Sequence, residues 1–348
     1  MPTVYVGMSG GIDSSAAAYL LKEQGYKVTG ITFTAYREEG LKKCCSIEDL
    51  NDAKKVCSFL GIAHKVIDVR DVFSARIISN FVKSYRAGLT PNPCVLCNRY
   101  VKFGAMLEYS ISEGADFFAT GHYSRITEKD GEYLIGEGLD PSKDQSYFLS
   151  YIEKSKLPYI KLPMGVYLKK DIRVLAEKAG LPISPRKSES QDICFIKDDY
   201  RDFLKAQGVP EIEGFFVYKG KIFPDRRGIA YYSFGQRRGL AVAAGERVYI
   251  RKFNTRDNTI ILGGKPMSKE FSVRSLNIFT DKFSPEIKCD VRFRYQSPLA
   301  TCKVTHDGSR ASVVLEEERG FIAPGQFAVF YKDGYVYASG EIESSVLL

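Results

Sequence analysis

The stretch that decides the fold is VYVGMSGGIDSS, residues 4–15. It begins with a short apolar strand at residues 4–8 and runs through a turn rich in serine and glycine into a segment with helical spacing of its apolar residues. A turn between a buried strand and a helix lies at the carboxyl edge of a parallel sheet, where such proteins bind ligands. Gly10 and Gly11 allow a tight turn, and the helix start offers unpaired N–H groups and a partial positive charge. The stretch therefore predicts a phosphate-binding loop.

The side chains of this loop indicate which type of phosphate-binding site it forms. Ser9, Ser14 and Ser15 supply hydroxyl donors, whereas Asp13 has the same sign of charge as phosphate, so we expect a bridging Mg²⁺ ion there. The loop is not a Walker loop, because no Gly-Lys-Ser/Thr follows, and it lacks the Gly-x-Gly-x-x-Gly of dinucleotide-binding proteins. The alternative interpretation is an ordinary strand-to-helix turn with a serine cap.

Outward from the loop, the chain continues to alternate strands and helices. The expected strands are residues 4–8, 27–33, 64–69 and 116–120, and the expected helices are residues 14–24, 48–60 and 169–179. Strands joined through helices imply right-handed crossovers and a parallel sheet. The fold class that we predict for this part of the chain is therefore α/β, with a doubly wound parallel sheet.

The pattern changes near residue 197. Residues 200–265 mix a short helix with β-prone pieces, and from residue 271 onward alternating strands are divided by turns such as Asp307-Gly308. That spacing predicts a small C-terminal β-barrel. We therefore expect three domains, which are the α/β domain at residues 1–198, a small central mixed domain at 199–266 and the barrel at 267–348.

The composition limits the classes of protein to which this chain can belong. The chain has 348 residues, 44% of them hydrophobic and 26% charged, which favours a folded globular protein over a disordered one. Its formal charge of +8 fits a polyanionic partner such as RNA, although a slightly basic surface is also common in soluble proteins. The first residues lack the basic lead and apolar core of a signal peptide, and no apolar run reaches the ~18 residues of a membrane span. We therefore expect a cytoplasmic protein with no membrane association.

Three of the eight cysteines lie in patterns that indicate chemistry. Cys94 and Cys97 form a Cys-x-x-Cys in the segment TPNPCVLCN, and Cys194 lies in QDICF. We expect the two prolines to keep the chain out of helix until about Leu96, which would place Cys97 near a helix N-terminus, where a thiolate is stabilised. Two cysteines cannot complete a structural zinc site, so thiol chemistry or an iron–sulfur cluster remains.

The other five cysteines give weaker signals. Cys57 belongs to an apolar helix face, and Cys289 and Cys302 fall in expected strands. The adjacent Cys44 and Cys45 are expected in a loop, and their role stays open.

The motifs described above resemble those of a known protein superfamily. Ser-Gly-Gly-x-Asp-Ser at residues 9–14 resembles the loop of the PP-loop ATP pyrophosphatases, which adenylate an oxygen and release pyrophosphate. The whole set of motifs resembles the tRNA-specific 2-thiouridylases of that superfamily, nearly from end to end. The further matching segments are TPNP (90–93), CN (97–98), KF (102–103), ATGHY (119–123), KDQSYFL (143–149), ICFI (193–196), GQRRGL (235–240), RY (294–295) and PGQ (324–326).

The resemblance implies roles residue by residue. ATP would bind at Gly7, Met8, Ser9, Gly10, Gly11, Ile12, Asp13, Ser14, Phe33 and Gly121. The catalytic residues would be Asp13, acting on the metal–phosphate complex, Cys97 as nucleophile and Cys194 as persulfide carrier. The target base would meet Asn92, Pro93 and Cys94, and the tRNA would contact His122, Lys143, Asp144, Gln145, Arg294, Tyr295 and Gln326.

The same resemblance implies an activity and its participants. The reaction would be ATP-dependent 2-thiolation of the wobble uridine in the tRNAs for lysine, glutamate and glutamine. ATP and Mg²⁺ would be required, and a cysteine desulfurase or sulfur-relay protein would donate the persulfide. Family members have an adenylating domain, a small central domain and a C-terminal β-barrel, which agrees with the changes of pattern along this chain.

One position departs from the family pattern. Many members carry aspartate where this chain has Cys94, and some thiolases of the superfamily hold a [4Fe–4S] cluster with three cysteines. Cys94, Cys97 and Cys194 would supply three such ligands and leave one iron open. The persulfide route and the cluster route therefore both remain open, as does the oligomeric state.

Two rival functions belong to other classes. A PP-loop ligase acting on a small metabolite would account for the phosphate loop but not for the cysteines or the C-terminal β region. A protein that only binds RNA would not release pyrophosphate from ATP.

Overall fold

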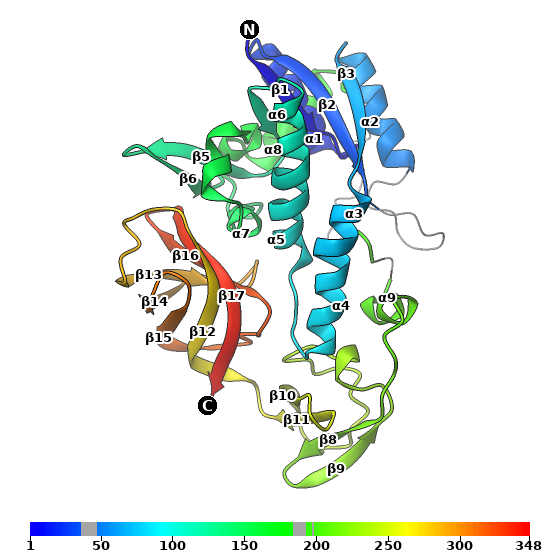
Figure 1. Cartoon of the computed structure of the whole chain (residues 1–348), viewed down its shortest axis with the longest axis vertical. Helices are drawn as coiled ribbons and strands as arrows, with labels where there is room; N and C mark the ends of the chain where they lie inside the picture. Colours follow the sequence, from blue (N-terminus) through cyan, green and yellow to red (C-terminus); the bar gives the residue numbers. More distant parts are fainter. Residues whose placement is uncertain (36–46, 184–192, 197) are drawn as a thin grey trace. The chain divides into compact units, whose positions relative to one another are not determined.

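The computed structural model describes residues 1–35, 47–183, 193–196 and 198–348 (Figure 1). Cys44 and Cys45 lie outside the described residues. The chain divides into two compact units, and each is made of several segments. The first unit is Met1–Ile77, Cys94–Lys197 and Asp333–Val336, and the second is Ile78–Pro93, Asp198–Lys332 and Tyr337–Leu348.

The first unit is built on a parallel sheet of five strands in the order β3-β2-β1-β4-β7. These strands are β1 (Thr3–Gly7), β2 (Lys27–Thr34), β3 (Ala63–Asp68), β4 (Phe117–Ala119) and β7 (Ile160–Lys161). The strand order reverses between β1 and β4, because the chain builds β1, β2 and β3 outward and then returns to the other side of β1. The carboxyl ends of β1 and β4 therefore form the switch point at which ligands bind in such sheets.

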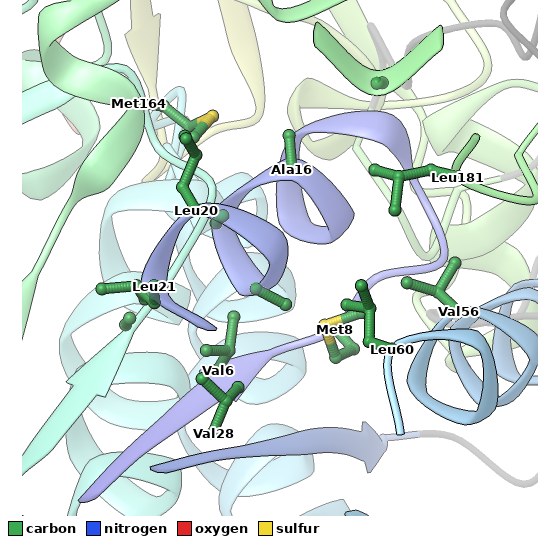
Figure 2. Close-up of a cluster of buried hydrophobic side chains, with 14 of the residues drawn as sticks. Val6, Met8, Ala16, Leu20, Leu21, Val28, Val56, Leu60, Met164 and Leu181 are labelled. Carbon is green, nitrogen blue, oxygen red and sulfur yellow. The ribbon is translucent and has the colours of Figure 1, made fainter. Parts of the chain in front are cut away.

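Helices cover both faces of this sheet. On one face, α1 (Ile12–Glu23), α2 (Ile47–Phe59) and α8 (Lys169–Lys178) bury their apolar sides in a single core cluster with β1 and β2 (Figure 2). Phe118 of β4 points to the opposite face, since side chains alternate along a strand, and Phe103 packs edge-on against it at 5.8 Å. The doubly wound α/β fold is thereby confirmed.

Phe103 belongs to a continuous helical stretch formed by α5 (Pro93–Cys97), the π-helical η2 (Asn98–Met106) and α6 (Leu107–Ser112). The helix begins at Pro93, earlier than the expected start near Leu96. Proline is favoured at the first helical position, because the N–H that it lacks has no helical partner there. Cys97 thus lies in the second turn, farther from the helix N-terminus than the sequence indicated.

The remaining elements of the first unit include a hairpin that the sequence analysis did not predict, β5 (Ser124–Lys129) and β6 (Glu132–Glu137). Asp130 and Gly131 join its strands with positive φ angles. The short helices of this unit are α3 (Arg70–Phe73), η1 (Ser74–Ile78), α7 (Ser146–Leu149), η3 (Lys154–Tyr159) and η4 (Pro163–Val166).

The second unit contains the expected barrel. Six strands in the order β12-β15-β14-β13-β16-β17 close on themselves through pairing of β12 with β17. They are β12 (Met267–Ile278), β13 (Glu286–Arg292), β14 (Ala300–His306), β15 (Ala311–Gly320), β16 (Phe327–Lys332) and β17 (Tyr335–Leu347).

A second, mixed sheet has the order β10-β11-β8-β9. Its strands, together with the helices of this unit, are β8 (Gly214–Tyr218), β9 (Lys221–Asp225), β10 (Tyr249–Asn254), β11 (Thr259–Gly263), α4 (Ser79–Arg86), α9 (Tyr200–Ala206) and η5 (Ile229–Tyr231).

Across the part of the chain that the structure describes, none of the helices has the length and apolar character needed to cross a membrane.

Candidate functional site

The phosphate loop follows β1 at the switch point, and its backbone requires glycine. Gly10 has a φ of +70°, and a Cβ there would lie 2.3 Å from the carbonyl oxygen of Asp49. Gly11 caps the N-terminus of α1, a helix of twelve residues. The first turn of α1 therefore directs backbone N–H groups and the positive end of the helix dipole toward the loop.

The serines of the loop divide into an outer and an inner set. The side chains of Ser14 and Ser15 are buried and donate hydrogen bonds to the carbonyl oxygen of Gly11 at 3.0 and 2.9 Å. Ser14 Oγ also accepts a hydrogen bond of 3.2 Å from the backbone N–H of Ser9. Ser14 and Ser15 thus hold the loop in shape, whereas Ser9 is exposed on it.

The segment that follows β4 presses against this loop. A Cβ on Gly121 would lie 2.6 Å from the carbonyl carbon of Asp13 and 2.7 Å from the backbone nitrogen of Ser14. Glycine is therefore needed for the close approach of two backbones. Of the other residues expected at ATP, Met8 and Phe33 have buried side chains.

The carboxylate of Asp13 is held by residues from two other elements. Lys169 Nζ donates to both of its oxygens at 2.7 Å, and the Tyr123 hydroxyl donates to Oδ1 at 2.7 Å. Tyr123 is fixed in turn by Gln145, whose backbone N–H donates to the Tyr123 carbonyl and whose side-chain Oε1 accepts from its N–H. A carboxylate oxygen is the kind of ligand that Mg²⁺ prefers. Both Asp13 oxygens accept from Lys169 in this structure, and the expected metal–phosphate role of Asp13 stays a prediction.

The motif at residues 143–149 is largely turned inward. Asp144 is buried and accepts hydrogen bonds from the N–H of Gly138, the N–H of Ser146 and the Ser146 hydroxyl. Gln145 binds the backbone of Tyr123, as described above. Both side chains, which the resemblance assigns to tRNA, are thus engaged in holding the segments around the phosphate loop.

His122 is partly buried next to the same segments. Its Nδ1 lies 2.6 Å from Thr120 Oγ1 and its Nε2 lies 3.4 Å from Lys102 Nζ. Since an ammonium only donates, Nε2 is the acceptor and the Nδ1–H donates to Thr120. Burial, together with the Lys102 charge, holds the pKa of His122 well below its usual range, so the ring is neutral.

All three cysteines expected to act in sulfur chemistry lie in the first unit. Cys97 is buried, and Cys94 and Cys194 are partly exposed. Burial and, to a lesser extent, the nearby Cys194 raise the pKa of the Cys94 thiol to about 11, and Lys102 opposes that rise. Cys194 therefore lies close to Cys94 in space although it is distant in sequence, and Lys102 faces this pair.

A metal cluster requires several ligands at one point. Within the described ranges, no three His, Cys, Asp or Glu side chains gather so as to hold a metal ion, and these ranges include Cys94, Cys97 and Cys194. The three cysteines, as arranged, do not fit an iron–sulfur cluster.

Most of the remaining expected residues lie in the second unit, where a loop is hydrogen-bonded to the barrel. The Gln326 side chain donates to the carbonyl oxygens of Thr90 and Pro91 at 2.9 and 3.3 Å, and Asn92 Nδ2 donates to Gln326 Oε1 at 3.4 Å. Gln326 thus fixes the conformation of the loop that ends at Pro93.

Two other residues expected to contact tRNA, Arg294 and Tyr295, follow β13 in a turn rather than continuing the strand. Arg294 is exposed and Tyr295 is partly buried. Lys143, in the first unit, precedes Asp144 in a turn.

Sequence analysis assigned no role to two lysines of the first unit. Lys102 was noted only as part of a matching segment, and Lys169 was noted only as the start of a helix. Both lie among groups expected to be functional, Lys102 beside Cys94 and Lys169 on Asp13. No local pattern distinguishes either from a surface lysine, because their partners come from distant segments.

Comparisons with known proteins agree with this arrangement. A family model described as "tRNA methyl transferase HUP domain" matches residues 2–198, and one described as "Aminomethyltransferase beta-barrel domain" matches residues 268–342. Curated proteins named tRNA-specific 2-thiouridylase MnmA are similar over nearly the whole chain. Those of Syntrophus aciditrophicus and Pelotomaculum thermopropionicum are 37% and 38% identical, over 99% and 98% of this chain and 93% and 97% of their own lengths. That of Fusobacterium nucleatum is 40% identical over 98% of this chain and 93% of its own.

Proposed function

The chain belongs to the family of tRNA-specific 2-thiouridylases, and we propose that it is a tRNA sulfurtransferase that uses ATP to replace the C2 oxygen of a uridine with sulfur. The relatives named for this activity match the chain over nearly its full length. The observation that carries the proposal is that Cys97 and Cys194 lie in the unit that also contains the phosphate loop, with Cys194 close to Cys94, three residues before Cys97. Activation and sulfur transfer are then available within one unit.

The C2 oxygen must be activated by adenylation before sulfur can replace it. The C2 oxygen of uridine is a poor leaving group, so it first attacks the α-phosphorus of ATP. An oxygen–phosphorus bond forms, and pyrophosphate departs. The backbone N–H groups at the start of α1 stabilise the charge on the departing pyrophosphate. Mg²⁺, held by Asp13 and the phosphates, would supply further charge neutralisation when bound.

Sulfur transfer follows by the persulfide route. The terminal sulfur of a Cys194 persulfide attacks C2, the bond from C2 to the adenylated oxygen breaks, and AMP leaves. Cys97 then attacks the Cys194 sulfur, which releases the transferred sulfur to the base and forms a Cys97–Cys194 disulfide. An external thiol reductant reopens that disulfide. No step involves a cluster, because the cysteines do not fit one.

The substrate and the donor extend the same proposal. We expect the target to be the wobble uridine in the tRNAs for lysine, glutamate and glutamine, unstacked from its loop to reach Asn92, Pro93 and Cys94. Exposed Arg294, next to Tyr295, suits contacts to phosphate and base. A cysteine desulfurase or sulfur-relay protein would load Cys194. The proposed domains remain the α/β domain at residues 1–198, the central domain at 199–266 and the barrel at 267–348.

Incubation of the protein with unmodified tRNA, ATP and a persulfide donor tests this function. Mass spectrometry of the digested tRNA should find 2-thiouridine, with stoichiometric release of pyrophosphate and AMP. Asp13→Ala should lose pyrophosphate release and keep tRNA binding, whereas Cys194→Ser should lose thiolation. Pyrophosphate release without any thiolated nucleoside would favour the small-molecule ligase, and tRNA binding without pyrophosphate release would favour a protein that only binds RNA.

A further inference from the structure

A lysine with no carboxylate partner lies beside the sulfur residues. The Lys102 side chain is partly buried, and its Nζ lies 3.4 Å from Nε2 of His122, whose ring is neutral. In the part of the chain that the structure describes, no carboxylate forms an ion pair with this ammonium. Removing a cation from water costs free energy unless a counter-charge is close. The charge of Lys102 is therefore available to an anion that forms or binds at this point.

The helix that carries Lys102 widens after Cys97. Residues Asn98–Met106 are π-helical, and the N–H of Leu107 donates to the carbonyl oxygen of Lys102, five residues earlier. In a regular α-helix, Lys102 would lie about 80° around the axis from Cys94, which is eight residues before it. The wider π-helical turns rotate the chain less per residue, so this angle becomes smaller. The π-helical stretch therefore brings Lys102 toward the helix face that carries Cys94.

The surroundings of the ammonium agree with this geometry. The charge of Lys102 acts on the Cys94 thiol, and so does the nearby Cys194. The ring of His122, which accepts the hydrogen bond from Lys102, is itself fixed by the Thr120 hydroxyl at 2.6 Å. Lys102 is thus hydrogen-bonded to the segment after β4 and faces the two thiols.

The proposed sulfur transfer creates negative charge on sulfur at this place. The Cys194 thiol first loses its proton to solvent, because a thiolate is the nucleophile. The thiolate attacks the terminal sulfur of the donor persulfide, the bond between the two donor sulfurs breaks, and the donor thiolate leaves. The new Cys194 persulfide then loses its proton to solvent before its terminal sulfur attacks C2. Each anionic form carries one negative charge that a neighbouring cation stabilises.

We propose that Lys102 is a further catalytic residue of sulfur transfer, and that its ammonium pairs first with the Cys194 thiolate and then with the terminal sulfur of the Cys194 persulfide. The role in transfer rests on the function proposed above, whereas pairing with the thiolate can be measured without turnover. Neutral His122 holds the ammonium in place by accepting one hydrogen bond and leaves its charge to the sulfur.

Alkylation of Cys194 by iodoacetamide tests this pairing in the full chain, without tRNA or ATP. The rate is followed by mass spectrometry of the Cys194 peptide from mildly acidic to strongly alkaline pH. At neutral pH, Lys102→Gln should react roughly 10-fold more slowly than the wild type, because one nearby opposite charge favours the ionised form by about that factor or more. The two rates should converge in alkali, where both proteins carry the thiolate. Lys102→Arg should recover much of the rate, because it keeps the charge.

Two controls separate charge from folding. Lys156→Gln is the matched variant, because Lys156 is a partly buried lysine of the same unit that pairs with Glu108 at 2.7 Å. Alkylation of Cys57, a buried core thiol, reports any loosening of the fold in the same samples. Equal Cys194 rates in Lys102→Gln and wild type at neutral pH would overturn the proposal. A loss by the same factor at every pH would overturn it as well, since it would indicate altered access rather than altered charge.

The thiolation reaction separates this inference from the function on which it rests. Lys102→Gln should form 2-thiouridine roughly 10-fold more slowly and release pyrophosphate at the wild-type rate. A lower ATP affinity of Lys102→Gln with unchanged Cys194 alkylation would assign Lys102 to the nucleotide and overturn the proposal. A wild-type protein that forms no 2-thiouridine, although its Cys194 alkylation depends on Lys102, would contradict the proposed function alone and support the pairing.

Discussion

Replacing Gly121 by alanine tests whether the segment after β4 sets the position of the phosphate loop. The added Cβ would lie 2.6 Å from the carbonyl carbon of Asp13, 2.7 Å from the nitrogen of Ser14 and 2.9 Å from the carbonyl oxygen of Asp13. These are backbone atoms, so no side chain can rotate away. Ordinary contact begins at 3.4 Å, so the two backbones must separate by about 0.8 Å.

Two magnitudes follow from that displacement. Overpacking of this kind costs about 1–3 kcal/mol of unfolding free energy. A shift approaching 1 Å at a reacting site lowers the rate by roughly 100-fold. We therefore expect Gly121→Ala to fold, to lose about 1–3 kcal/mol of stability, and to release pyrophosphate with a kcat/KM roughly 100-fold below that of the wild type.

Gly264→Ala is the matched control, because its Cβ meets no atom within 4 Å and its φ is not positive. Denaturant unfolding and tRNA-dependent pyrophosphate release are measured for both variants. A Gly121→Ala protein as stable and as active as the Gly264→Ala protein would refute the argument that this close approach positions the loop.

Two further predictions concern single side chains. Cys194→Ser should abolish 2-thiouridine formation, whereas Cys57→Ser should keep it, because Cys57 is a core thiol whose pKa is raised by burial to about 11. Nucleoside mass spectrometry of tRNA treated with each variant compares the two. Thiolation by Cys194→Ser would exclude the persulfide route. Burial and Lys102 lower the pKa of His122 below its ordinary 6.5, so the unfolded chain binds an additional proton in mild acid, and the free energy of unfolding should fall as the pH drops below 6.5. His122→Gln should flatten that fall in pH-dependent denaturation, and an unchanged slope would show that the ring is not the group responsible.

The fold followed from the sequence wherever the signal was local. Apolar periodicity gave the strands and helices around the phosphate loop close to their observed bounds, for example 14–24 for Ile12–Glu23 of α1. The turns between strands likewise predicted the barrel, which is confirmed. The hairpin of β5 and β6 was missed, although Asp130-Gly131 is a turn signal of the kind used for the barrel.

Only part of the site could be predicted from the sequence, because the partners of a side chain depend on tertiary structure. The glycines of the loop were identifiable, since backbone geometry dictates them. The partner of Asp13 was not, because Lys169 is brought to it by a helix 156 residues away. In the same way, the bonds of Gln145 and Gln326 to backbone groups of neighbouring segments were not predicted, while the tRNA contacts expected of both stay predictions.

The surroundings of Cys94 lead to a prediction that separates the two sulfur routes. With a pKa raised to about 11, Cys94 is protonated at neutral pH, so it is a poor nucleophile. Burial is the main cause of the raised pKa, the nearby Cys194 adds to it, and Lys102 opposes it.

If Cys94 only lines the base pocket, its thiol is dispensable. Cys94→Ser should then keep much of its thiolation activity, and so should Cys94→Asp, which restores the residue that many family members carry. Protein purified without oxygen should contain no stoichiometric iron by elemental analysis. Joint loss of iron and activity in Cys94→Ser would overturn this argument, because it would mean that the three thiols come together around a cluster in the active protein.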